Sequence, residues 1–546
     1  MNSKKTIKTS ILFLVCIYIC LALFPIASSA HAYIVNSNPK ENEVFSKSPT
    51  KIDIEFNEPI QSGFHSLELI NSSGKQTKLD AKIKEMTILE ANIKDTLPKG
   101  TYALQWKAVS ADGHPVQGVI PFSIGSVQDD SVMMLAKNSS YMPNIDMIVL
   151  RWILYISFAI YIGVAVFHLL IHKELGNPNI SRSTFFIWIS LIGMFLAIVL
   201  NLPLQTRINA GVSWLDAFDL SLLKETLGQT SFGIIWIIQL LLLLMLIIFT
   251  LIVIKQKSFS SWNKWIVPLL LLVGLLISKS FIGHAASSNH KFIALVMNFL
   301  HLFAGSLWLG SLFSIVLLIP GKVKQNGDNL YWKAIQTVSL LAICSVLTIL
   351  LTGIYESFSY IPTIYSLLHT DYGIALLVKI ILFFVMLVFG AFHFRKGKKH
   401  AGKRVTATIG IELLVGLMVF IAAAFLTNLP PASSTPGPFH QTQNIDHGYA
   451  ATLKISPNKE GINAFTFDLE KNGKPVEDIE QITLTFTHLD MDMGKSSTNM
   501  FKKSSGEYEA KGMFFSMSGK WNVQVHILTK SLESIDINYQ PNVGIH

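Results

Sequence analysis

The sequence predicts a mixed fold: a polytopic α-helical membrane bundle of eight spans, flanked by two extracytoplasmic β-sandwich domains. Half of the 546 residues are hydrophobic and only 14% are charged, whereas soluble globular proteins average about a quarter charged residues. The apolar residues are concentrated between about 148 and 428, and both flanks alternate apolar and polar residues in short runs. Basic residues gather in every second connection between the apolar segments.

The first thirty residues have the pattern of a secretion signal. They begin with a basic stretch that contains Lys4, Lys5 and Lys8. An apolar run over 11–24 follows, and small residues at Ser28 and Ala30 predict cleavage after Ala30. The alternative is an uncleaved anchor helix. Cleavage would make His31 the new amino terminus.

Eight apolar segments are long enough to cross a membrane, because a helix needs about 20 apolar residues for a hydrocarbon core of about 30 Å. We predict spans at 148–171, 184–203, 232–254, 265–283, 293–318, 334–357, 373–394 and 406–428. The connections after the first, third, fifth and seventh spans are basic, and the others hold little more than Arg207, Lys224 and Lys291. The positive-inside rule makes the basic set cytoplasmic and therefore places both flanks outside.

Each flank predicts a small β-sandwich. In the first flank, alternating runs at 51–56, 66–70 and 102–106 are separated by turn residues. The second flank shows the same alternation at 481–486 and 521–525. The predicted order is a signal peptide over 1–30, a sandwich over 31–125, a linker over 126–146, the membrane domain over 147–428, a proline-rich linker over 429–444 and a sandwich over 445–546.

Charge and cysteine content limit the classes of partner. The formal net charge is +9, but membrane topology explains the basic loops, so no nucleic-acid partner is expected. Of the three cysteines, only Cys344 lies outside the leader, so the mature chain has neither an internal disulfide nor a CxxC site. A soft metal ion would have to be held by histidine, methionine, carboxylate or the amino terminus.

The first sandwich carries a candidate metal site. The α-amine and imidazole of His31 can chelate one ion together, and Asp112 and His114 stand two residues apart in a predicted tight turn. Such a tetragonal set of nitrogen and oxygen donors suits Cu(II). From the spacing alone, an ordinary turn with a surface histidine is the favoured interpretation.

Three motifs of this domain resemble the CopC family of extracytoplasmic copper carriers: residues 31–39, 54–60, and 109–118 followed by 122–124. The resemblance implies Cu(II) bound by His31 and His114 with Asp112 as an adjacent ligand. Some members also carry a methionine-rich Cu(I) loop. This sequence has only Met86 in that region, so we predict no Cu(I) site in the first domain.

Polar residues inside the predicted spans are candidates for a transport pathway, because a charged side chain at mid-span costs roughly 2.5–3.5 kcal/mol on insertion scales. Met297 and His301 are four residues apart and share a helix face; with histidines at the outer end of the hairpin they predict a copper-binding mouth. Lys379, Met386 and His393 follow at intervals of seven on the seventh span. The full candidate set is His284, His290, Met297, His301, Lys379, Met386 and His393.

Each of these residues also has a structural interpretation. The methionines can fill an apolar core. Lys379 can extend to the membrane interface or pair with a carboxylate, and His393 can be an interfacial residue beside a basic loop. Residues 301–310, 351–355, and 370–373 followed by 377–379 resemble the CopD family of copper-associated membrane proteins, with alanine at 304 where many relatives have glycine.

The C-terminal sandwich resembles the YtkA-like domain in residues 491–494, 506–508 and 515–521. Because thioethers prefer Cu(I), the weaker copper candidates here are His488, Met491, Met493, Met500, Met513 and Met517. The alternative is that these methionines belong to the core. His440 and His447 have less support still.

The order of the domains resembles fused copper-uptake proteins of the YcnJ type. It implies copper acquisition and transport, with Cu(II) captured by the first domain and passed to a His/Met pathway in the membrane core, and possible Cu(I) binding in the last domain. Copper ions and the lipid bilayer are the expected partners, and an extracytoplasmic copper chaperone is a further candidate. We expect no enzymatic activity and no ATP-driven step, since the sequence has no GxxxxGK[ST] motif.

Three alternatives remain open. Histidines at 168, 301 and 393 could be axial ligands of haem in a membrane cupric reductase. An amino-terminal histidine with a second histidine also forms the copper brace of oxidative polysaccharide-cleaving enzymes. A protein that only buffers copper or confers resistance is the third alternative, and the direction of copper flux separates it from an importer.

Overall fold

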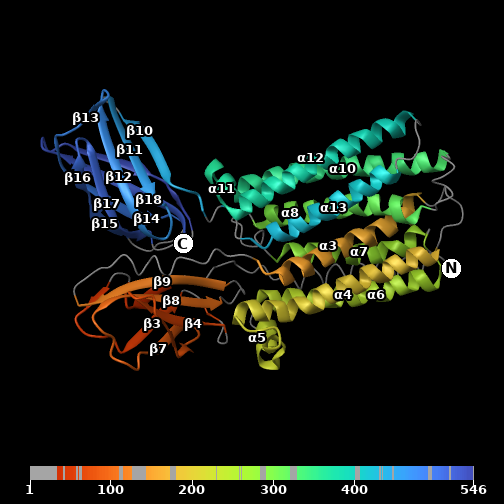
Figure 1. The fold of residues 1–546 in the computed structure, drawn as a ribbon, viewed down its shortest axis with the longest axis horizontal. Helices are drawn as coiled ribbons and strands as arrows, with labels where there is room; N and C mark the ends of the chain where they lie inside the picture. The colour runs from red at the N-terminus through yellow and green to blue at the C-terminus, as the bar shows by residue number, and fades with distance from the viewer. Residues whose placement is uncertain are drawn as a thin grey trace, which may run out of the picture. The chain divides into compact units, whose positions relative to one another are not determined.

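The computed structural model has a helical region preceded and followed along the chain by β-sheet domains, which confirms the predicted fold class (Figure 1). It describes residues 34–40, 43–56, 59–60, 64–109, 115–125, 143–171, 180–228, 230–257, 259, 261–282, 291–319, 329–399, 406–429, 432, 435–445, 448–489, 495–515 and 518–544. The chain divides into two compact units, one of residues 1–356 and 378–428 and the other of 357–377 and 429–546.

The N-terminal domain consists of two sheets. The first has the order β1 (Ile34–Asn38), β3 (Lys51–Phe56), β7 (Ile88–Asn92) and β6 (Ala81–Lys84). The second has the order β2 (Glu43–Phe45), β9 (Pro115–Ile124), β8 (Gly100–Val109), β4 (Ser66–Asn71) and β5 (Gln76–Leu79). Strand β3 buries Ile52, Ile54 and Phe56 on one face, as its alternating sequence predicts.

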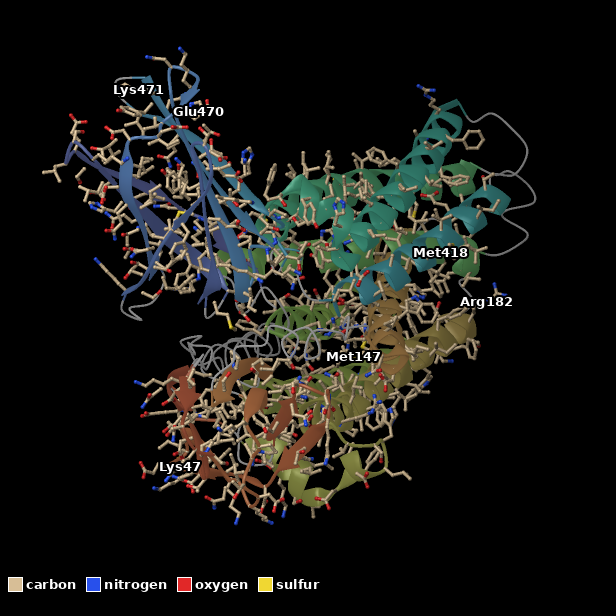
Figure 2. The ribbon with its side chains drawn as sticks, turned by 60° about the vertical axis from the view of Figure 1, so that its left-hand side comes forward. Lys47, Met147, Arg182, Met418, Glu470 and Lys471 are labelled. Carbon is tan, nitrogen blue, oxygen red and sulfur yellow. The ribbon has the colours of Figure 1, made fainter. Side chains whose placement is uncertain are left out.

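The C-terminal domain also has two sheets. One has the order β10 (Phe439–Ile445), β11 (Tyr449–Ser456), β12 (Gly461–Lys471), β17 (Glu507–Phe515) and β16 (Phe501–Ser504), with β13 (Lys474–Pro475) paired to β12. The other has the order β15 (Lys495–Asn499), β14 (Ile479–His488), β18 (Gly519–Thr529) and β19 (Ser534–Tyr539), with β20 (Asn542–Val543) paired to β18. Aromatic residues fill the core, where Phe465 contacts Phe486 and Phe515. Figure 2 shows Glu470 and Lys471 together at one tip of this domain.

The helical region contains α3 (Ile145–Val166), α4 (Ile180–Ala210), α5 (Leu220–Gly228), α6 (Ser231–Lys255), α7 (Trp262–Ser280), α8 (Lys291–Phe313), α10 (Asn329–Tyr360), α12 (Asp371–Lys399) and α13 (Thr406–Leu426). Two helices end in a π-helical turn, α3 at Phe167–Ile171 and α8 at Ser314–Leu318. The short helix α11 (Ile364–His369) lies between α10 and α12 in sequence.

Eight helices of the described part are long and apolar enough to cross a membrane. They are the helices of the preceding paragraph without the nine-residue α5 and the short α11. The protein is therefore a multi-pass membrane protein. Met147 in the first turn of α3 and Arg182 in the first turn of α4 lie apart in the helical region (Figure 2), as expected when α3 crosses the layer before α4 begins. Most of α3 is buried, whereas few residues of α10 and α12 are fully buried.

Helix α3 contacts α4, α8 and α13. Its crossing with α8 is close because both helices have a glycine there: a β-carbon on Gly163 would lie 2.3 Å from the carbonyl oxygen of Gly310. Small residues at a crossing let two backbones approach in a membrane. This contact fixes the position of α8, the helix that carries Met297 and His301.

Candidate metal pathway in the helical region

The predicted Cu(II) ligands of the first domain, His31, Asp112 and His114, lie outside the described residues. The described strands define the two ends of the 110–114 connection, because β8 and β9 pair in register as far as Val109 and Pro115. The ligand set remains a prediction.

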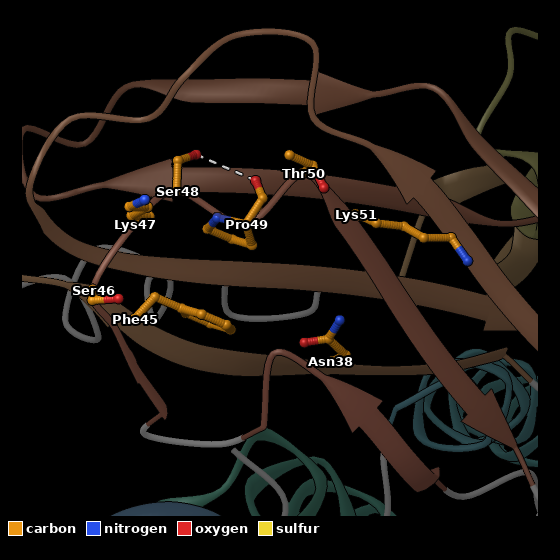
Figure 3. A pocket seen from close by; sticks show the side chains of 8 residues that line it. All are labelled: Asn38, Phe45, Ser46, Lys47, Ser48, Pro49, Thr50 and Lys51. Atoms are coloured by element: carbon orange, nitrogen blue, oxygen red, sulfur yellow. Dashed lines mark hydrogen bonds between the residues drawn. The ribbon is translucent and has the colours of Figure 1, made fainter.

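A pocket of about 340 Å³ lies elsewhere in the same domain, between the end of β1 and the start of β3 (Figure 3). It is lined by Asn38, Phe45, Ser46, Lys47, Ser48, Pro49, Thr50 and Lys51. These side chains include two lysines but no imidazole, thioether or carboxylate, so they do not form a copper ligand set.

Of the histidines that were predicted for the membrane pathway, His301 is the one whose side chain is described. His284 and His290 lie outside the described residues, and so does the side chain of His393 on α12. His301 is half-buried on α8, and its side chain contacts residues of α10 and α12.

Both ring nitrogens of His301 have a partner. Nδ1 lies 2.8 Å from Oγ1 of Thr352 on α10, and Nε2 lies 3.2 Å from Nζ of Lys379 on α12. Thr352 is 51 residues away and Lys379 is 78 residues away. The tertiary fold therefore places a hydroxyl, an imidazole and an amine in one continuous chain across α10, α8 and α12.

The hydrogen bonds determine which nitrogen of His301 carries the proton. Thr352 Oγ1 donates to the carbonyl oxygen of Thr348 at 2.7 Å, so its one hydrogen is in use and it accepts from Nδ1. An ammonium group has only donors, so Lys379 donates to Nε2. Both contacts assign the proton to Nδ1 and leave the lone pair on Nε2.

A carboxyl side chain lies on the same helix as Thr352. Glu356 follows Thr352 by one helical turn on α10, so the two residues share a face of that helix. We did not single out Thr352 or Glu356 as ligating or charged candidates from the sequence. Glu356 could have been found, since the rule that selects ionisable residues within apolar spans applies to it as well as to Lys379.

The two methionine candidates of the pathway have different surroundings. Met297 lies one turn before His301 on α8 and is half-buried, so the predicted shared face is available for a second ligand. Met386 is completely buried in the apolar core beside Gly416. That location favours the interpretation of Met386 as a core residue.

His168, one of the candidate haem ligands, is fully buried in the π-helical turn at the end of α3. Its Nε2 lies 2.8 Å from Ser183 Oγ, and its ring contacts Phe259. His301 contacts Thr352 and Lys379 instead. The two histidines therefore lie in separate environments.

In the C-terminal domain, His488 is buried at the end of β14. Its Nε2 lies 3.3 Å from the carbonyl oxygen of Ser518, and its ring meets the edge of Trp521. Met500 is buried in the hydrophobic core, and Met513 is half-buried on β17. Met491, Met493, Met517 and His447 lie outside the described residues, and His440 is exposed on β10.

Within the described parts of the chain, no group of three or more histidine, cysteine, aspartate or glutamate residues is placed to hold a metal ion. A copper ion at His301 would therefore have few protein ligands. The thioether of Met297, one turn earlier on α8, is a candidate soft donor. Few-coordinate sites of imidazole and thioether suit Cu(I).

The sequence matches four family descriptions: the CopC domain over residues 34–125, the N-terminal domain of copper resistance protein D-like proteins over 142–292, copper resistance protein D over 332–426, and YtkA-like over 444–526. Copper transport protein CutJ of Bacillus subtilis (strain 168) is 38% identical over 526 residues, which cover 95% of this chain and 97% of that protein. Protein YobA of Escherichia coli (strain K12) is 32% identical over 98 residues, 17% of this chain and 79% of that protein.

Among solved structures, that of CopC from Methylosinus trichosporium OB3b covers 18% of this chain and 98% of its own, with 22% identity and a TM-score of 0.17. The family matches confirm the resemblance that the motifs of all three domains predicted. The chain belongs to the CutJ family and joins a CopC domain, a CopD membrane domain and a YtkA-like domain in one polypeptide.

Proposed function

We propose that this protein acquires copper outside the cell and transports it across the membrane, without catalysing a reaction. The observation that carries the proposal is His301: an imidazole inside an eight-span bundle, held between Thr352 and Lys379, in a chain that also has a CopC domain. A polar group of this kind is costly in a bilayer and marks a path for substrate. The name of the relative CutJ, a copper transport protein, supports copper as the transported ion.

In this proposal the ion is captured as Cu(II) by His31, Asp112 and His114 on the extracytoplasmic side. It then reaches the outer mouth, formed by His284, His290, Met297 and His301, and continues past Lys379 and His393 on α12. Both sandwiches lie outside the cell, as the basic cytoplasmic loops predict. An extracytoplasmic chaperone is a candidate donor of copper to the first domain, and the methionines of the last domain are candidates for Cu(I).

The test is the copper content of cells grown under copper limitation. We compare cells that express the wild type, His31→Ala, His114→Ala or His301→Ala, with protein levels matched by immunoblot. The wild type is expected to raise cellular copper, and each variant is expected to lose most of the gain. His526→Ala is the matched control, because His526 is an exposed histidine of the last domain that pairs with Asp536.

The outcomes separate import from its alternatives. Lower copper in cells with the wild type would overturn import and favour resistance or export. Unchanged total copper, with protein-bound copper recovered on purification, would favour buffering. A haem absorption band in the purified protein that is lost in His301→Ala would favour the cupric reductase.

A further inference from the structure

We propose that Lys379 is a tethered cation that occupies the copper-binding lone pair of His301 in the empty protein, and that copper binds there by displacing Lys379 toward Glu356. The inference rests on the proposed function, because it concerns how the same site accepts its substrate. Copper transport alone does not imply that Lys379 occupies the site, that Nε2 of His301 binds the ion, or that Lys379 moves toward Glu356.

The first step is the tautomer of His301, which has its proton on Nδ1. Thr352 Oγ1 donates to Thr348 at 2.7 Å and so accepts from Nδ1–H of His301 at 2.8 Å. The hydroxyl is almost fully buried, so this hydrogen bond also fixes the orientation of the imidazole ring. A histidine that is held through one nitrogen offers the other to a metal ion, which is the usual arrangement of histidine ligands in metal sites.

The second step is competition for one electron pair. The lone pair on Nε2 is the pair that would bind copper, and Nζ of Lys379 lies 3.2 Å from it. An ammonium and a metal ion cannot both use this lone pair, and their positive charges repel each other strongly where water is scarce. Copper therefore binds His301 only after Lys379 has moved.

The third step is the destination of Lys379. Glu356 stands one turn from Thr352 on the same helix, so α10 presents both the group that orients His301 and a carboxyl group that can receive the displaced ammonium. The four-carbon stem of lysine is flexible enough to exchange partners without movement of α12. Pairing with Glu356 would also keep the displaced charge neutralised inside the membrane.

The fourth step is the kind of ion. A monovalent ion that replaces the ammonium at His301 adds less charge to the bilayer interior than a divalent ion does. Cu(I) accepts two ligands, and Nε2 of His301 with the thioether of Met297 supplies one borderline and one soft donor. No electron transfer is part of the proposal, because copper is supplied as Cu(I) in the test.

The experiment measures Cu(I) affinity of the purified full-length protein in nanodiscs, under anaerobic conditions, by competition with a chromophoric Cu(I) chelator. Because other domains also bind copper in our proposal, each variant is compared with the same variant carrying His301→Ala, and the difference is the His301-dependent component. Lys379→Leu removes the competing charge and introduces no donor atom for Cu(I). We expect it to tighten the His301-dependent component about tenfold or more, within the usual range of coupling between two sites.

The opposite sign is expected for Glu356→Gln. Without the carboxylate, Lys379 stays on His301, and the His301-dependent affinity for Cu(I) falls. Lys379→Arg keeps the cation and is expected to bind Cu(I) no more tightly than the wild type. Lys279→Leu is the matched control, because Lys279 is a buried lysine on α7 whose hydrogen bond goes to the carbonyl oxygen of Ile282, and it should leave the His301-dependent component unchanged.

Weaker or unchanged His301-dependent binding in Lys379→Leu would overturn the proposal, because it would make Lys379 a supporting or indifferent residue. Tighter binding in Lys279→Leu as well would overturn it too, since any loss of positive charge would then suffice. If the wild type imports copper but shows no His301-dependent Cu(I) binding, this inference fails and the proposed function stands. If the affinities follow the prediction but cells gain no copper, the tethered cation stands and import fails.

Discussion

Gly163 of α3 and Gly310 of α8 bring two helix backbones into direct contact: a β-carbon on Gly310 would lie 2.3 Å from the carbonyl oxygen of Ala159, and one on Gly163 would lie equally close to that of Gly310. Backbone atoms cannot yield as a flexible side chain can. The crossing therefore requires glycine on both helices, and it positions the helix that carries His301.

We predict that Gly163→Ala or Gly310→Ala forces the two helices apart and lowers the free energy of unfolding by about 1–3 kcal/mol, the usual cost of overpacking. Thermal unfolding of the purified protein in nanodiscs measures the change. The control is Gly390→Ala on α12, where a β-carbon would meet nothing within 4 Å. Equal melting temperatures for Gly310→Ala and Gly390→Ala would contradict the close crossing.

A second prediction concerns Asp146 in the first turn of α3. Its carboxylate accepts hydrogen bonds from Arg207 at 2.6 Å and from the indole of Trp214 at 2.8 Å, and the side chains of Asp146 and Arg207 are only about a quarter exposed. Hydrogen bonds to charged groups contribute about 1.5–3 kcal/mol when they are protected from water. We expect Asp146→Ala to destabilise the protein by about that amount.

The comparison for Asp146 is an exposed ion pair. Lys454 and Asp468 lie 2.8 Å apart on the second sandwich, and an exposed pair contributes at most about 1 kcal/mol. Lys454→Ala should therefore change the melting temperature little. A loss as large as that of Asp146→Ala would show that burial does not distinguish the two pairs.

A third prediction separates core methionine from metal ligand in the last domain. Met500 is 7% exposed and packs in the sandwich core. Met500→Leu should leave both stability and Cu(I) stoichiometry almost unchanged, whereas Met500→Ala should cost about 2–5 kcal/mol because it leaves a cavity. Loss of a bound Cu(I) in Met500→Leu, measured by equilibrium dialysis, would restore the interpretation of Met500 as a ligand.

A fourth prediction concerns acid sensitivity of the first domain. Lys51 lies 2.8 Å from Glu90, and this hydrogen bond, with the attraction of the lysine, lowers the pKa of the Glu90 carboxyl below its ordinary value. A lowered pKa in the folded state gives stability that is present above the ordinary glutamate pKa and is lost as the pH falls through the lower folded value. As the pH falls from about 5 to about 3, the melting temperature of the wild type should decrease more than that of Glu90→Gln. Equal losses in the two proteins would show that the pair does not contribute.

Much of the fold follows from the sequence because it depends on local pattern. The length of apolar segments determines the spans, and alternation of apolar and polar residues determines the strands, as at Ile52, Ile54 and Phe56. Helix α3 begins at Ile145, three residues before the predicted span. The carboxylate of Asp146 can lie in this first turn because it accepts hydrogen bonds from Arg207 and Trp214, which follow α3 in the sequence. That contact is not visible in a hydropathy pattern.

The sequence alone, through motif and composition, determined the family, the order of the three domains and His301 as a polar residue within a span. The tertiary structure alone decided which residues meet His301, because Thr352 and Lys379 come from helices 51 and 78 residues away. It also decided that Met386 and Met500 face apolar cores, although their spacing allowed a metal site. The reason is physical: periodicity assigns a side chain to a face of its own helix or strand, but the partner of that face is fixed only when the elements pack, and here a close glycine crossing and a chain of hydrogen bonds fix it.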